Sequence, residues 1–430
     1  MSTPIHDHAP GPGAVPHPSS RTVAAPDRRD RPGPHAPALP PAPSTSIAVV
    51  EGIATGTPGL VMDQADGARR VAELFDDPRQ QTRIPRVYAK TMVRTRHLAV
   101  DPLAPEFLEY SRRPGTIRER MGLYFEHAVP LAVDVARRAL ADAAADAADV
   151  GLLVFVTSTG FIAPGVDIAV LEQLGLSRSV GRLVVNFMGC AAAMNGIRTA
   201  ADHVRAHPDH KALVVCLELS SVNAVFGDDL GEVITHSLFG DGCGAMVIGA
   251  GQVQQPLPAG RIVLRDGFSR LLDGAEDGIV LGVNHDGVTC ELAEELPDYI
   301  RRGVAPVIDE VLADNGITQA DIALWAIHPG GPKIIEQSAL SLGLDPAVAD
   351  VSWDVLAEYG NMLSVSLVFV LERMARRAVA DPGAPGVTTG VAFSFAPGVT
   401  LEGVLFDIVV SEPAAEQPAV DGDEPLGDGR

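Results

Sequence analysis

The chain has 430 residues, a formal net charge of −22 and a hydrophobic fraction of 46%. This length predicts two to three domains or one large two-lobed unit, and the negative charge argues against nucleic acid as a partner. No apolar run reaches the roughly 18 residues that a membrane span needs, and the N-terminus lacks the apolar core of a signal peptide. The four cysteines, at positions 190, 216, 243 and 290, have neither disulfide-like nor metal-like spacing, which indicates a reducing cytoplasm.

The two ends of the chain differ in composition from its middle. Residues 1–45 hold 12 of the 34 prolines, and residues 411–430 hold six acidic residues and one arginine. Neither segment has enough apolar residues to form a core, so we expect both to be disordered tails. Between them we expect two halves, 46–255 and 256–410, and the first folded element is a strand at the start of the first half.

A basic segment follows a helix that we predict over residues 61–75. Arg83, Arg86, Lys90 and Arg94 fall on one face of a second predicted helix, with no acidic residue among them. A solvated basic face is one interpretation of this pattern. The other is a binding site for phosphate groups, which the acidity of the rest of the chain makes more distinctive.

Apolar strands alternate with amphipathic helices through the rest of the chain, a pattern that predicts an α/β fold. The predicted strands cover residues 151–156, 183–187, 211–218 and 323–327, and the longest predicted helices cover residues 118–149 and 296–315. Two further strands, joined by a Pro-Gly turn, precede the C-terminal tail. The strand at 183–187 is an apolar run apart from Asn186, which is typical of a strand buried on both faces of a sheet.

Cys190 follows this strand after a Met-Gly turn, and we expect it to begin an alanine-rich helix. The backbone N–H groups and the dipole at a helix N-terminus stabilise a thiolate relative to a thiol. Three alanines directly after the cysteine leave room above the sulfur. A small buried cysteine at a tight turn is the alternative interpretation of this residue taken alone.

The C-terminal half repeats this plan with two other polar residues. His328 ends the strand at 323–327, and Asn361 precedes a long apolar helix. Taken alone, they can be read as a core histidine and a helix N-cap. Together with Cys190 they suit nucleophilic catalysis: a histidine accepts the proton of a cysteine, and ring N–H and amide groups stabilise a carbonyl that develops negative charge.

Five motifs resemble those of the chalcone synthase-like family of type III polyketide synthases, within the thiolase superfamily. They are FMGCAAAMN at Cys190, SLFGDGCGA at Phe239, AIHPGGPKIIEQ at His328, YGNMLSVS at Asn361 and FAPGVTLEG at Pro397. The resemblance spans residues 49–410. It implies a thiolase-like αβαβα five-layered fold with two duplicated halves, and a homodimer. Ketoacyl synthase III also uses Cys, His and Asn, but it usually has a different sequence after the histidine.

The resemblance also implies a role for each residue of the set. Cys190 corresponds to the nucleophile that takes a starter acyl group from coenzyme A. His328 and Asn361 correspond to the pair that binds the malonyl thioester carbonyl and stabilises the enolate left by decarboxylation. That enolate then attacks the cysteine-bound thioester in a Claisen condensation. Acyl-CoA and malonyl-CoA are therefore the implied partners, and neither a cofactor nor a metal is expected.

Two further sets of residues match positions of the family. Phe239 matches the gatekeeper aromatic residue between the coenzyme A tunnel and the cavity, although a core phenylalanine beside a Gly turn explains it equally well. Arg83, Arg86 and Lys90 fall where the family binds the phosphates of coenzyme A, which agrees with the second interpretation of the basic face.

Several pocket positions depart from the plant members of the family, which argues against an aromatic starter. They are Ser158, Ser220, Asn223, Cys290 and Leu363. The chain is more similar to bacterial members that convert fatty acyl starters to alkylpyrones or alkylresorcinols. In these members an acyl tunnel is lined at the positions of Thr159, Ala163, Ser220 and Ala224, whose small side chains suit a long acyl chain. Close packing of small residues is the competing interpretation.

The leading hypothesis is a type III polyketide synthase that forms an alkyl-α-pyrone from a medium- or long-chain acyl starter. An alkylresorcinol or another small phenolic product would need only a different cyclisation. Two further hypotheses are a ketoacyl synthase III-like condensing enzyme and a non-catalytic thiolase-fold scaffold. The intact set of Cys190, His328 and Asn361 argues against the scaffold.

Overall fold

The computed structural model describes residues 46–112, 117–224, 230–252, 256–283, 288–380 and 386–410. The two segments predicted to be tails lie outside these ranges. Nine strands form the main sheet: β1 (Ser46–Gly56), β4 (Val150–Thr157), β5 (Gly181–Asn186), β6 (Lys211–Leu219), β7 (Asp241–Gln252), β8 (Ile262–Leu271), β11 (Leu324–Ile327), β12 (Val387–Ala396) and β13 (Thr400–Val409). Their order is β11-β12-β13-β8-β1-β7-β6-β4-β5.

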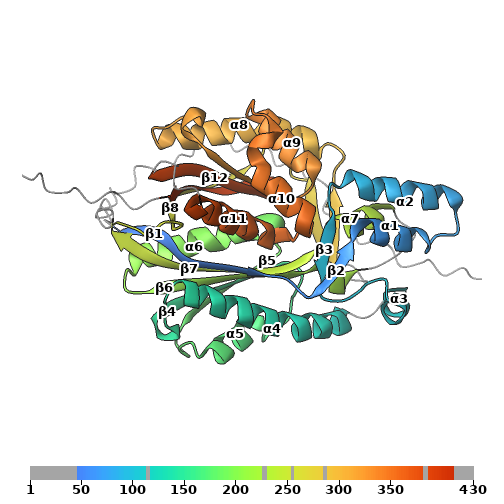
Figure 1. The fold of residues 1–430 in the computed structure, drawn as a ribbon, viewed down its shortest axis with the longest axis horizontal. Coiled ribbons are helices and arrows are strands. Elements are labelled where there is room, and N and C mark those ends of the chain that lie inside the picture. The colour runs from blue at the N-terminus through green and yellow to red at the C-terminus, as the bar shows by residue number, and fades with distance from the viewer. Residues whose placement is uncertain are drawn as a thin grey trace, which may run out of the picture. The chain divides into compact units, whose positions relative to one another are not determined.

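Strand β1 joins the strands of the N-terminal half to those of the C-terminal half. It pairs with β7 along nearly its whole length but with β8 only at residues 48–50. The two parts of the sheet therefore diverge from this short junction and lie on either side of a central pair of helices (Figure 1).

Three layers of helices alternate with these two parts of the sheet (Figure 1). The central layer contains α6 (Ala192–Ala206) and α11 (Ser366–Ala380), one outer layer contains α4 (Ile117–Asp142) and α5 (Val166–Leu174), and the other contains α8 (Leu296–Asp314) and α9 (Pro332–Ser341). One buried apolar cluster surrounds the central helices and contacts both parts of the sheet, and each outer layer packs on the sheet through a cluster of its own. The predicted αβαβα arrangement of five layers is confirmed.

The alternation of side chains along each strand explains this layering. In β6, Val214 faces the central helices, whereas its neighbours Leu213 and Val215 face α4 and α5. Successive residues of a strand point to opposite faces, so a strand that is apolar at every position is covered by helices on both sides. Gly196 lets α6 approach closely, because an added Cβ there would lie 3.1 Å from Val156.

The strand predicted at 183–187 does not follow this rule. It forms β5, which pairs only with β4 and ends the sheet. Leu183 and Val184 are 37% and 45% exposed, so the prediction of a strand buried on both faces is wrong. The apolar sequence shows that the segment is a strand, but only its place at the edge of the sheet decides its exposure.

A smaller group of elements packs beside the C-terminal end of α10 (Asp350–Tyr359). It contains β2 (Leu60–Asp63), β3 (Thr95–Leu98), α1 (Gln64–Ala72), α2 (Pro78–Lys90) and α7 (Leu230–Leu238). Helix α3 (Pro105–Arg112) follows β3 in the chain. The helix predicted from residue 61 begins only at Gln64, because Asp63 is extended and its carboxylate accepts hydrogen bonds from the N–H groups of the first turn. Of the helices in the described ranges, none combines the length and the apolar character that a membrane crossing requires.

Candidate active site

Cys190 lies at the turn between β5 and α6. It occupies a short 3₁₀ turn, Gly189–Ala191, and α6 itself begins at Ala192, so the cysteine precedes the α-helix rather than starting it. Gly189 has a positive φ of 56°, which a glycine adopts without strain, and its N–H donates a hydrogen bond of 3.1 Å to Ser158 Oγ. This contact ties the nucleophile turn to the end of the neighbouring strand β4.

The side chain of Asn361 reaches this turn from the other half of the chain. Its amide Nδ2 lies 4.0 Å from Cys190 Sγ and donates a hydrogen bond of 3.3 Å to the carbonyl of Gly330. Its Oδ1 accepts a hydrogen bond of 2.8 Å from Leu363 N. Because the oxygen is engaged on the backbone, the NH₂ group is the side that faces the sulfur.

His328 follows β11 and is held by its backbone. Its N–H donates to Phe393 O at 3.0 Å, and its carbonyl accepts from Gly330 N at 2.9 Å. The residue is 2% exposed, and neither ring nitrogen has a hydrogen-bond partner among the described residues. Burial lowers the pKa of His328 to about 3, with a small opposing contribution from Asn361. The ring is therefore neutral and retains both an unused donor and an unused acceptor.

The environment of Cys190 differs from the sequence-based expectation. The residue keeps a partly exposed surface, yet burial raises the pKa of its thiol, and Cys290 and Glu218 raise it further. Asn361 and the backbone N–H of Cys190 act in the opposite direction but do not outweigh burial. Burial therefore opposes the thiolate that the sequence led us to expect, and it favours a neutral thiol at Cys190.

Glu218, which the sequence analysis did not single out, lies beneath the nucleophile turn. It is fully buried at the end of β6, and its carboxylate accepts hydrogen bonds from Ser158 N at 2.9 and 3.0 Å. The hydroxyls of Thr159 and Ser364 donate to it at 2.8 and 2.7 Å. Burial raises the pKa of Glu218 to about 7, although these hydrogen bonds lower it. A single acidic residue at the end of an otherwise apolar strand was the available signal.

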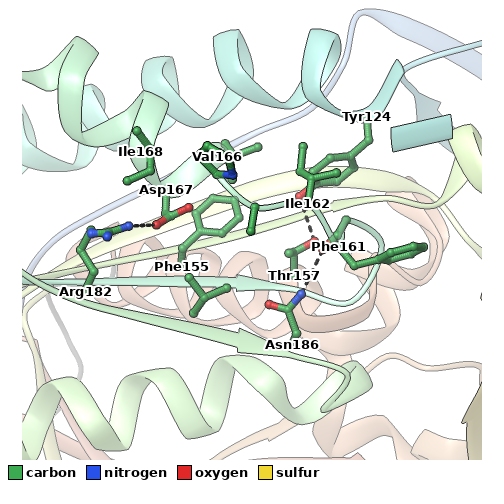
Figure 2. A pocket seen from close by; sticks show the side chains of 15 residues that line it. Tyr124, Phe155, Thr157, Phe161, Ile162, Val166, Asp167, Ile168, Arg182 and Asn186 are labelled. Carbon is green, nitrogen blue, oxygen red and sulfur yellow. Dashed lines mark hydrogen bonds and ion pairs between the residues drawn. The ribbon is translucent and has the colours of Figure 1, made fainter. Parts of the chain in front are cut away.

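Ala163 lines a cavity of about 530 Å³ that lies between β4, β5 and the loop before α5. Figure 2 shows aromatic and aliphatic side chains, among them Tyr124 and Phe161, around this space. Asn186 donates a hydrogen bond of 3.1 Å to Gly160 O at one side of it. The cavity therefore offers mainly apolar surface next to the strand that leads to Cys190.

The other residues predicted to line an acyl tunnel lie elsewhere. Ser220 and Ala224 line a second, narrower pocket together with Phe239. Thr159 lines neither space, because it is buried with its hydroxyl on Glu218. The described residues thus place these positions around separate spaces, whereas the prediction put them in one tunnel.

The remaining predicted pocket residues are distributed around the turn. Ser158 and Leu363 contact the backbone of Gly189 and the side chain of Asn361, respectively, as described above. Asn223 donates a hydrogen bond of 2.9 Å to Thr159 O. Cys290 lies on β10 (Val288–Leu292), which pairs with β9 (Ile279–Val283), and burial raises the pKa of its thiol to about 11.

Sequence comparison covers both halves of this structure. The family model described as chalcone and stilbene synthases, N-terminal domain, matches residues 42–252, and the corresponding C-terminal domain model matches residues 264–410. The chain belongs to the chalcone and stilbene synthase family. The resemblance stated from the motifs is therefore confirmed.

Individual relatives of the synthase agree with this assignment. "Alpha-pyrone synthesis polyketide synthase-like Pks18" of Mycobacterium tuberculosis is 64% identical over 371 residues, which cover 86% of this chain and 94% of the relative. The crystal structure of PKS-I from the brown alga Ectocarpus siliculosus is 39% identical with a TM-score of 0.78, and the match covers 85% of this chain and 99% of that one. The C-terminal type III polyketide synthase domain of Steely1 from Dictyostelium is 28% identical with a TM-score of 0.76, covering 85% and 100%. The chain is a type III polyketide synthase, a condensing acyltransferase.

Three of the four residues of the predicted basic face lie on α2, but Arg94 lies beyond the end of this helix, with its Nη2 3.9 Å from Glu358 Oε1. Arg83, Arg86 and Lys90 are exposed along this helix, and none of them forms an ion pair with another described residue. These three side chains, which have no acidic partner among the described residues, attract anions in a chain that is otherwise strongly acidic.

Proposed function

We propose that this synthase loads an acyl group from acyl-CoA onto Cys190, extends it with malonyl-CoA and releases an alkyl-α-pyrone. The observation that carries the proposal is the approach of the Asn361 amide to Cys190 Sγ, at 4.0 Å, beside a buried neutral His328. The relative from Mycobacterium tuberculosis, named for alpha-pyrone synthesis, supports the product.

Loading begins from the neutral pair. Transfer of the Cys190 proton to the free ring nitrogen of His328 gives the thiolate, which attacks the thioester carbonyl of acyl-CoA. The carbonyl re-forms as the sulfur of coenzyme A leaves, and this sulfur takes the proton from His328. Because burial disfavours both charged groups, the ion pair is expected only when the substrate is in place.

In the extension step, His328 and Asn361 act as hydrogen-bond donors. The ring N–H of His328 and Nδ2 of Asn361 bind the thioester oxygen of malonyl-CoA, where negative charge develops as carbon dioxide leaves. The resulting enolate carbon attacks the acyl carbon on Cys190, so a carbon–carbon bond forms and the cysteine sulfur leaves. The extended chain, now on coenzyme A, returns to Cys190 for the next cycle. Attack of an enol oxygen of the extended chain on its own thioester carbonyl forms the C–O bond of the six-membered pyrone ring. The C–S bond of the thioester breaks in this step, and the leaving sulfur takes the enol proton.

We further propose that the synthase is a homodimer that pairs through β5. This edge strand has unpaired backbone groups and presents Leu183 and Val184 to solvent. An exposed apolar edge strand favours pairing with another strand, and a second copy supplies an identical one. The cavity lined by Ala163 also borders β5, so a second copy there would cover part of its wall.

The proposed reaction uses only side chains of the protein and coenzyme A thioesters. That no cofactor is needed stays a prediction, and so does a cytoplasmic location.

The test of the proposed function is incubation of the purified synthase with malonyl-CoA and each of a series of acyl-CoAs, followed by mass analysis of the products. An alkyl-α-pyrone that retains the starter chain is expected. A resorcinol product would mean that only the cyclisation step differs from the proposal. Products that form only when the malonyl groups are supplied on acyl carrier protein would contradict the proposal.

A further inference from the structure

Arg96 of β3 is a buried arginine that the proposed chemistry does not use. The residue is 4% exposed and forms no ion pair with another described residue. Its Nη1 donates to the carbonyls of His236 and Phe239, the latter at 3.3 Å, and its Nε donates to Gln64 Oε1 at 3.0 Å. A guanidinium stays charged even where burial lowers its pKa, so these oxygens must replace its water.

The carbonyls that hold Arg96 belong to the C-terminal end of α7. The last carbonyls of a helix have no partner within the helix and carry partial negative charge. Gln64 completes the arrangement, because its Nε2 donates to Ser237 O at 2.7 Å and to Thr91 Oγ1 at 2.9 Å. Arg96 and Gln64 together therefore form a buried cap on this helix end.

The capped segment leads directly to the catalytic amide. Asn361 N donates to Leu238 O at 2.8 Å, and Gly240 N donates to Asn361 O at 3.0 Å, which places Phe239 and Asn361 side by side in a short parallel bridge. The backbone of the residue that faces Cys190 is thus fixed on the segment whose carbonyls Arg96 holds.

The loop before Asn361 also packs against the same side chain. Gly360 has a positive φ of 70°, and a Cβ added there would lie 3.1 Å from Arg96 Cγ. The aliphatic part of Arg96 therefore contacts the loop while its guanidinium holds the end of α7.

We propose that Arg96 is a positioning residue that sets the Asn361 amide, and with it Phe239, for decarboxylation and condensation. This inference rests on the role given to Asn361 in the proposed function. A displacement of the amide weakens its contact with the developing enolate oxygen but leaves the sulfur of Cys190 in place. Decarboxylation is therefore more sensitive to Arg96 than acyl loading is.

The test compares Arg96→Gln, Arg96→Lys and the control Arg69→Gln, an exposed arginine of α1. In Arg96→Gln we expect kcat for malonyl-CoA decarboxylation to fall about tenfold or more with KM within about twofold, while Cys190 still takes one acyl group from acyl-CoA. Arg96→Lys should recover part of kcat, since an ammonium can hold one of the carbonyls. The control should match the unsubstituted synthase.

Unchanged kcat in Arg96→Gln, or equal losses of decarboxylation and loading, would overturn the inference. If the Arg96 variants do not fold, Gln64→Leu tests the inference instead, because it removes the other side chain of the cap. This variant should also lower kcat for decarboxylation, by a smaller factor.

Asn361→Ala in the same assay separates the two proposals. Full decarboxylation by that variant would contradict the proposed function, whereas its loss together with normal Arg96→Gln activity contradicts only the role of Arg96.

Discussion

Asn361 Nδ2 and Cys190 Sγ lie 4.0 Å apart, although 171 residues separate them in the chain. One belongs to the turn before α6 and the other to the loop between α10 and α11, and both turns meet at the same end of the central helical layer. The amide is oriented by two backbone contacts, so it faces the sulfur without any substrate present. Such preorganised donors act on developing charge without having to move during the reaction.

Cys190→Ala should abolish acyl loading, because the acyl thioester has no other anchor. Mass analysis after incubation with acyl-CoA measures the loading. Cys190→Gln should keep malonyl-CoA decarboxylation, since it leaves His328 and Asn361 intact and removes only the nucleophile. Normal loading of the alanine variant would assign the nucleophile to another residue.

Replacement of Arg83, Arg86 and Lys90 by alanine should raise KM for both coenzyme A substrates with a smaller effect on kcat. The three side chains are exposed on α2, and each lost charge-assisted contact with a phosphate is expected to cost about 1–2 kcal/mol. Arg69→Ala, on α1, serves as the control for a lost surface charge. If the triple variant kept an unchanged KM, the basic face would be only a solvated surface.

Starter size should depend on Ala163, which lines the larger cavity. Each methylene of an acyl chain that enters an apolar space contributes up to about 0.8 kcal/mol, so kcat/KM should rise with chain length and then level off. Ala163→Phe should shift the preference toward short acyl-CoAs without reducing decarboxylation. Ala347→Phe, at an exposed position that lines neither pocket, is the control. An optimum at acetyl-CoA that Ala163→Phe does not alter would argue against a tunnel.

Glu218 should make folding stability fall as the pH rises. Burial raises the pKa of Glu218 from its ordinary value of 4.5 to about 7, so the folded state holds this proton more tightly than the unfolded state. Its contribution is fully present below pH 4.5 and is lost by pH 7, a change on the order of 3 kcal/mol in the free energy of unfolding. Glu218→Gln, which does not titrate, should lose less stability between pH 4.5 and 8 in urea denaturation.

Glu73→Gln, at the exposed residue that follows α1, should follow the unsubstituted protein in the same experiment. Other buried groups also titrate in this range, among them Asp241, whose pKa burial raises to about 6. The quantity to compare is therefore the difference between Glu218→Gln and the parent protein at each pH. Identical slopes for the two proteins would show that Glu218 does not titrate as expected.

The proposed dimer should depend on the exposed side chains of β5. Changing Leu183 and Val184 to lysine should give a monomer, because charged side chains on an edge strand oppose pairing. Light scattering after size-exclusion chromatography measures the mass of the species. Val387→Lys, at a valine that is 55% exposed on β12, should leave the dimer intact. A parent protein that is itself monomeric would contradict the proposal.

Features that depend on short-range order could be predicted from the residues alone. The alternation of apolar strands and amphipathic helices predicted the α/β layers. Arg83, Arg86 and Lys90 of α2 share one face because a helix repeats every 3.6 residues. The turn with Cys190 and the segment with His328 were recognisable because their motifs are contiguous in the chain. These features need no knowledge of which elements pack together.

Features that depend on contacts between distant segments could be read only from the folded chain. The apolar strand 183–187 gave no sign that it would lie at the edge of the sheet, because strand order is set by how the elements pack. The helix N-terminus predicted a thiolate at Cys190, but burial beside Cys290 and Glu218 raises its pKa. Solvation and charge–charge interactions depend on distances in space, and the sequence does not contain those distances before the chain folds.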